Sequence, residues 1–79
     1  PGVYFGGAKL IEAGLSTCFL AGCDLSGLIL TRAQLSSATL TEANLNGAKL
    51  VGAYLESAIL TRANLRAAIL TKASLRDVR

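Results

Sequence analysis

Residues 33–67 read AQLSS ATLTE ANLNG AKLVG AYLES AILTR ANLRA, seven pentapeptides in which alanine comes first and leucine third. The same spacing continues outward on both sides, because leucine stands at every fifth position from Leu10 to Leu75, fourteen times in all. A small residue stands two positions before most of these leucines, with Leu28 among the larger exceptions. The repeating unit is therefore A-x-L-x-x.

A five-residue period does not suit a helix or a flat sheet. On an α-helix, five residues turn the chain by about 500°, or about 140° net, so the leucines would spread around the whole circumference. On a flat strand side chains alternate between faces, so successive leucines would point to opposite sides. Only a backbone that turns a corner once per repeat sends every leucine to one axis, and the sequence therefore predicts a solenoid.

Composition supports one small, apolar, regularly packed domain without a membrane helix. The chain has 79 residues, of which 52% are hydrophobic and 16% charged, a balance too apolar for a disordered chain. The longest apolar stretch, Cys18 to Leu30, is interrupted by Asp24 and Ser26 and is shorter than the roughly 20 residues that a membrane span needs. The N-terminal PGVYFGGAKL does not resemble a secretory signal.

The units AQLSS, ATLTE, ANLNG and ANLRA resemble the A-(D/N)-L-x-x motif of the pentapeptide-repeat proteins. The resemblance covers residues 3–79, so residues 1–79 are expected to form a single pentapeptide-repeat domain. It implies an all-β fold, a right-handed quadrilateral parallel β-helix of about four coils, in which residue i stacks on residue i+20. The chain departs from the motif before leucine, where only Asp24, Asn44 and Asn64 keep the aspartate or asparagine.

Charges and amides support the stacking of residues twenty apart independently of the resemblance. Three acids have a basic residue twenty positions later, namely Glu12 with Arg32, Glu42 with Arg62, and Glu56 with Arg76. Asp24, Asn44 and Asn64 also fall in one column. Stacked strands favour both arrangements, since opposite charges attract across neighbouring strands and amides form ladders.

The residue inventory excludes most catalytic and metal chemistry. The sequence contains no histidine, so a histidine base, a histidine-ligated metal and the usual serine or cysteine triads are ruled out. Cys18 and Cys23 stand at the small inward position, where we expect two reduced, buried thiols. No catalytic residue, metal site or cofactor is predicted.

One face of the predicted solenoid combines aliphatic and basic residues, and we take it as the candidate interaction face. Its members are Lys9, Ile11, Ile29, Arg32, Lys49, Val51, Ile69 and Lys72. Glu12 is the only acid on this face. The alternative is that β-branched residues stand here because they favour strands, and that ILTRA at 29–33 and ILTKA at 69–73 reflect a duplication.

Three classes of function differ in what they require of the sequence. The first is a noncatalytic structural or protein-interaction module, which binds a protein partner or associates with itself through its coil ends or one face. The second, implied by the resemblance, is a DNA mimic that inhibits type II topoisomerases such as gyrase. The net charge of +3 disfavours mimicry, which requires rows of negative charge.

The third class, an enzyme, lacks an acid–base pair or metal ligands. We therefore predict a noncatalytic module that binds no nucleic acid and does not span a membrane. Its expected setting is the cytoplasm, and the resemblance points to cyanobacteria, in which the family is abundant.

Overall fold

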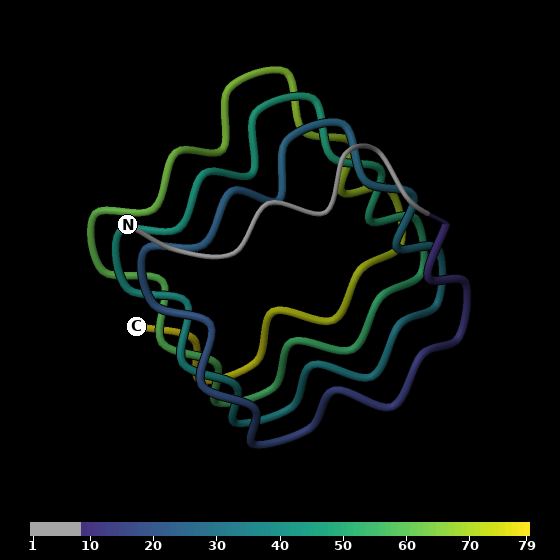
Figure 1. Ribbon diagram of the computed structural model, residues 1–79. Coiled ribbons are helices and arrows are strands. Elements are labelled where there is room, and N and C mark those ends of the chain that lie inside the picture. Colours follow the sequence, from purple (N-terminus) through teal and green to yellow (C-terminus); the bar gives the residue numbers. More distant parts are fainter. Residues whose placement is uncertain (1–8) are drawn as a thin grey trace.

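The computed structural model describes residues 9–79, which wind into a parallel β-helix with a four-sided outline (Figure 1). Between these residues the chain forms no helix and no extended strand, because each pentapeptide contributes a single β-bridge residue and then a turn. Every bridge is parallel and joins residues twenty apart, as in Lys9 with Ile29 and Tyr54 with Ser74. The predicted pairing of residue i with i+20 is confirmed. The number of coils in the whole chain stays a prediction.

Each corner is a four-residue turn that begins at a leucine. The Ala13 N–H donates to the Leu10 carbonyl oxygen at 3.0 Å, and the same bond recurs at later corners, as from Ala53 to Leu50. The third turn residue has a positive φ, which is the mark of a type II turn and normally calls for glycine. The residues other than glycine that adopt it are Glu12, Thr17, Arg32, Ser37, Glu42, Ser57, Arg62, Ala67, Lys72 and Asp77.

Backbone hydrogen bonds along the axis join each coil to the next. The Leu30 N–H donates to the Lys49 carbonyl at 2.7 Å, and the Lys49 N–H donates back to the Leu28 carbonyl at 2.8 Å. At the following corner the Arg32 N–H donates to the Val51 carbonyl at 2.8 Å. Since these bonds satisfy most peptide groups of a repeat, the coil needs no long strands to hold its register.

The interior is built from the leucines and the small residues, as the repeat predicts. All buried residues of the described chain are hydrophobic, and the best buried large side chains are Leu28, Leu30, Leu35, Leu40, Leu45, Leu50 and Leu55. Leu28 stands at the small position but is 0% exposed, so the axis accommodates a larger side chain there. Its described neighbour in the column is Ala48, one coil further along, whose side chain is small.

The prediction of two buried thiols is correct for Cys23 and wrong for Cys18. Cys23 is 6% exposed and belongs to the core, whereas Cys18 is only half-buried, and both are free thiols. Both cysteines lie in the first described coil, where the column neighbour of Cys18 is Ala38 and that of Cys23 is Ala43. The fully buried core begins at Cys23, and the inward side chains before it are only partly covered.

Candidate interaction surfaces

The structure gathers the predicted face into adjoining columns that run along the axis. We call the eight residues Lys9, Ile11, Ile29, Arg32, Lys49, Val51, Ile69 and Lys72 the apolar–basic face. Successive bridges join Lys9 to Ile29, Ile29 to Lys49 and Lys49 to Ile69. Lysine and isoleucine therefore alternate down one column, from coil to coil.

The side chains of this face differ in exposure. Ile11 and Ile69 are 48% and 43% exposed, whereas Ile29 and Val51 are half-buried. Lys9, Lys49 and Lys72 are exposed. The face thus presents two isoleucines openly to solvent, and the other two aliphatic residues are partly covered by their neighbours.

Arg32 is held at the corner of the face by a salt bridge. Its Nε donates to Glu12 Oε2 at 3.0 Å, one coil away. On its other side Arg32 lies over Gly52, where an added Cβ would come within 3.2 Å of Arg32 Cγ. The charge of Arg32 is therefore partly neutralised by Glu12. Within residues 9–79 the three lysines of the face form no ion pair.

The predicted stacks of charges and amides are confirmed in two charge pairs and in the amide ladder. Besides the Glu12–Arg32 pair, Arg62 Nε lies 3.5 Å from Glu42 Oε2. The ladder runs from Asn64 Nδ2 to Asn44 Oδ1 and from Asn44 Nδ2 to Asp24 Oδ1, each at 3.4 Å.

The third predicted charge pair is wrong as a salt bridge. Glu56 forms none with Arg76 among the described residues, and instead its Oε1 accepts a hydrogen bond from the Ser36 hydroxyl at 3.1 Å. The carboxylate thus interacts with serines of both neighbouring coils, Ser36 on one side and Ser74 on the other. Arg76 still contributes a smaller electrostatic effect on Glu56.

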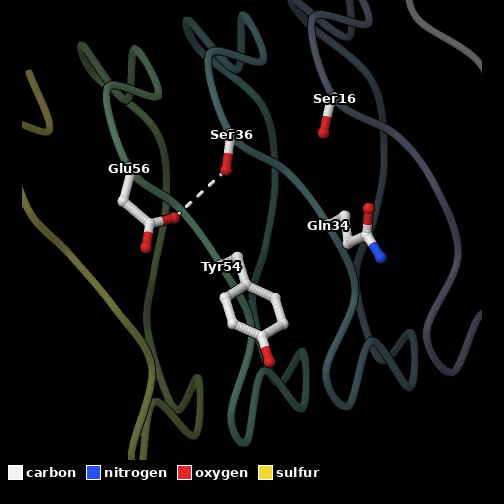
Figure 2. A pocket seen from close by; sticks show the side chains of 5 residues that line it. All are labelled: Ser16, Gln34, Ser36, Tyr54 and Glu56. Carbon is white, nitrogen blue, oxygen red and sulfur yellow. Dashed lines mark hydrogen bonds between the residues drawn. The ribbon is translucent and has the colours of Figure 1, made fainter.

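A hollow of about 490 Å³ opens on the next face, and Figure 2 shows the side chains that line it. The lining residues are Ser16, Gln34, Ser36, Tyr54 and Glu56. Gln34 and Tyr54 are bridge partners in one column, which begins at Gly14, where the missing side chain leaves open space. Sequence reasoning missed this hollow, although the spacing of Ser16, Ser36 and Glu56 by twenty residues places them in one polar column.

The hollow can bind through hydrogen bonds and an aromatic surface, but its groups are poorly suited to catalysis. The Ser74 hydroxyl first, then the Glu56 backbone N–H and the Ser36 hydroxyl, lower the pKa of Glu56, and burial opposes them. A carboxylate with a lowered pKa is a weak base toward a serine hydroxyl. Among residues 9–79 no three histidine, cysteine or acidic side chains lie together in a way that could hold a metal ion.

An exposed aromatic residue on a third face also escaped the sequence analysis. Phe19 is 77% exposed, the most exposed large hydrophobic side chain among the described residues. It bridges to Thr39, which bridges to Ile59, so these three residues form a column along the axis. The sequence signal for this column is the same spacing of twenty residues that places Ile29, Lys49 and Ile69 together.

The described residues contain no helix that is long and apolar enough to cross a membrane.

Comparison with known proteins identifies the family. The model of the pentapeptide repeats matches residues 18–56 and 48–79, with eight copies of the repeat. This chain belongs to the pentapeptide-repeat family, whose solved members are right-handed quadrilateral β-helices. Family membership agrees with the corner geometry and with the bridges between residues twenty apart.

Solved pentapeptide-repeat proteins of cyanobacteria are similar to this chain over most of its length. Rfr23 of Cyanothece 51142 is 33% identical with a TM-score of 0.64, and the match covers 99% of this chain and 50% of Rfr23. HetL of Nostoc sp. strain PCC 7120 is 32% identical with a TM-score of 0.57, over 96% of this chain and 46% of HetL. The Nostoc protein alr5209 is 37% identical with a TM-score of 0.52, over 89% and 62%.

The chain thus spans about half the length of the first two of these relatives. The comparison with curated proteins gives no match.

Proposed function

We propose that this chain is a noncatalytic protein-interaction module that binds an acidic partner through the apolar–basic face. The observation that carries the proposal is the column in which Lys9, Ile29, Lys49 and Ile69 follow one another through direct bridges. It offers positive charge and apolar surface in one row. The lysines have no ion-pair partner within residues 9–79, so their charges are available to a ligand.

The backbone beneath the column favours binding because it is already ordered. The bond from Leu30 to Lys49 at 2.7 Å and the bond from Lys49 to Leu28 at 2.8 Å fix the spacing of the side chains before any partner arrives. A preorganised surface loses less conformational entropy on association. Ile69 is 43% exposed, so covering the rest of its side chain would contribute roughly 1 kcal/mol. The lysines would steer acidic partners and discriminate against basic ones.

Binding without catalysis also agrees with one structural relative. HetL is described as involved in the regulation of heterocyst differentiation, a task that a binding protein can perform. The alternative, a DNA mimic that inhibits gyrase, has no observation in its favour. Two of the five acids, Glu12 and Glu42, are paired with arginines, and the net charge is +3. A phosphate-like row needs unpaired negative charges.

Affinity capture with two matched variants tests the proposal. The face variant carries Lys9→Gln, Ile29→Thr, Lys49→Gln and Ile69→Thr. The control variant carries Phe19→Thr, Ile59→Thr, Arg62→Gln and Arg66→Gln, so it loses the same numbers of apolar and basic side chains from other faces. Both keep bridge residues compatible with a strand, and a thermal melt confirms that each is folded.

We expect the parent chain and the control variant to retain the same acidic protein from a cyanobacterial extract, identified by mass spectrometry. We expect the face variant to lose it. The proposal would be overturned if the face variant kept that protein, or if the control variant lost it as well.

A further inference from the structure

The spacing of the lysines on the apolar–basic face determines what shape of partner can satisfy them. Bridges place Lys9 and Lys49 two coils apart in one column, with Ile29 between them. Neighbouring bridged residues are about 4.8 Å apart, so the two lysine positions are separated by about 9.6 Å along the axis. Ile69 follows one coil beyond Lys49, at about 14.4 Å from Lys9.

An α-helix laid along the axis matches these intervals. Residues seven apart lie on one face of a helix and about 10.5 Å from each other, within about 1 Å of the lysine spacing. Helix residues three or four positions after the one that meets Lys9 lie about 4.5 to 6 Å further along the helix axis, opposite Ile29. Helix residues ten or eleven positions after the one that meets Lys9 lie about 15 to 16.5 Å along the helix axis, and a slight tilt of the helix places them opposite Ile69.

Other common ligands do not match. In an extended strand, residues on the same face are separated by about 6.8 or 13.6 Å, so acids two or four apart would miss the second lysine. Phosphates of one DNA strand advance about 3.4 Å per base pair, and three steps of about 10 Å also carry the phosphate about 100° around the duplex, away from the face.

The charges around the column favour an acidic partner at the two lysines. Arg32 is occupied by Glu12 at 3.0 Å, so the corner beside the column does not compete for the same carboxylates. Lys49 and Lys9 are exposed and have no ion pair within residues 9–79. Ile11 and Val51 extend the apolar surface toward that corner.

We infer that the apolar–basic face binds an amphipathic acidic α-helix parallel to the coil axis, with carboxylates seven residues apart on Lys9 and Lys49 and apolar residues against Ile29 and Ile69. The inference rests on the proposed function and adds to it the secondary structure, charge and register of the partner. Helix-in-groove recognition in other proteins uses anchors at the same helical spacings.

Synthetic helical peptides of one composition but different register test the inference. The heptad peptide carries glutamates at positions 1 and 8 with leucines at 4 and 11, and the shifted peptide has the second glutamate at position 6 and the same leucines. Fluorescence anisotropy measures the binding of each to the parent chain and to Lys49→Glu. We expect the heptad peptide to bind at least about tenfold more tightly than the shifted one.

Exchanging the charge of Lys49 with that of the peptide residue that meets it gives a second test of the register. Lys49→Glu should weaken the heptad peptide about tenfold, and a peptide with lysine in place of the glutamate that meets this position should recover the loss. Equal binding of the heptad and shifted peptides would overturn the inference, because the seven-residue register is part of it. Binding of neither peptide would overturn the inference, and so would a preference for duplex DNA or anionic vesicles. Failure of the proposed function itself is recognised separately, by the face variant keeping its captured protein.

Discussion

At the scale of single residues, the left-handed corner is the most demanding feature of this chain. Every described turn places its third residue at positive φ, and ten of these residues are not glycine. A left-handed conformation costs an L-residue roughly 1 to 2 kcal/mol, and a β-branched residue such as Thr17 is a pronounced outlier. Hydrogen bonds to the neighbouring coil, such as that from the Thr17 N–H to the Ser36 carbonyl at 3.0 Å, hold the residue there.

Replacing Ala67 by glycine should therefore stabilise the fold. Ala67 has φ 56 and an exposed side chain, so the change relieves strain and removes little packing. After the greater backbone entropy of unfolded glycine is subtracted, we expect a gain of roughly 0.5 to 1 kcal/mol in the free energy of unfolding by urea denaturation.

Ala21 provides the matched control for Ala67. It is the second residue of its turn and is not among the residues at positive φ. Ala21→Gly should therefore cost roughly 0.5 to 1 kcal/mol. Equal destabilisation by both changes would contradict the strain explanation.

Two carboxylates make stability depend on pH in the acid range. The Ser26 hydroxyl at 2.6 Å and then the Ser26 N–H at 3.1 Å lower the pKa of Asp24 below 3.8, and the serines around Glu56 lower its pKa below 4.5. A lowered pKa in the folded state stabilises the fold above the unfolded value, and this contribution is lost as the pH falls through the folded value. The contribution is therefore complete above about pH 4.5 and declines below it.

The double variant Asp24→Asn and Glu56→Gln should lose less melting temperature than the parent between neutral pH and about pH 3. Asparagine at position 24 can continue the ladder of Asn44 and Asn64, so the change removes the charge and keeps the stacking. Asp77→Asn serves as control for the loss of a carboxylate, because Asp77 is exposed and forms no salt bridge within residues 9–79. A double variant with the same acid sensitivity as the parent would refute the assignment.

At the scale of the repeat, the interior leucine is the main source of stability. Leu50 is 1% exposed and lies in the middle of the core, whereas Leu75 is 42% exposed at the same position of its repeat. Leu50→Ala should cost about 2 to 5 kcal/mol, through lost burial and the cavity that remains.

Leu75→Ala should cost less than half as much, because part of that side chain already contacts water. Thermal and urea unfolding of the two variants measure the difference. Costs of similar size would show that exposure within the column does not govern the contribution of a leucine.

The repeat also explains how much could be predicted from the sequence. The five-residue period and the spacing of small residue and leucine were sufficient to predict the solenoid. The columns of residues twenty apart followed from it, including the Glu12–Arg32 pair and the ladder from Asp24 to Asn64. The choice between the two column neighbours of Glu56 could not be predicted, because it depends on which side chain reaches the carboxylate, and here Ser36 does.

The shape of the surface could not be predicted from the repeat pattern either. The hollow depends on the sizes and positions of Gln34, Tyr54 and Glu56 together, and none of these residues departs from the repeat. The exposure of Phe19 does not follow from the repeat either, because the repeat places the residue outside but does not determine how much its neighbours cover it.

At the scale of the whole molecule, the coil edge and the apolar–basic face make different demands on self-association. Within residues 9–79 the amides of Leu65 and Leu70 have no backbone acceptor, and exposed strand edges pair readily. Two copies of the apolar–basic face would oppose each other, because their lysines repel. We therefore expect any oligomer of this chain to form through its coil edges.

Light scattering on the parent and on Ile29→Lys combined with Ile69→Lys distinguishes the two routes. The parent should form larger species as its concentration rises, and the double variant should behave in the same way. A variant that becomes monomeric would favour the face instead, and a parent that stays monomeric at high concentration would refute self-association.

The pairing of residues twenty apart underlies every column described above, and short-range crosslinking of two introduced cysteines tests it most directly. In a background with Cys18→Ala and Cys23→Ala, the bridge partners Thr39 and Ile59 are replaced by cysteine and treated with dibromobimane, which fluoresces after it joins two nearby thiols. A second protein carries cysteines at Thr39 and Tyr54, fifteen residues apart. The four-sided coil predicts rapid crosslinking of positions 39 and 59 and little of 39 and 54, because position 54 lies on the preceding face in line with Gln34 and Ser74. Preferential crosslinking of 39 and 54 would contradict it.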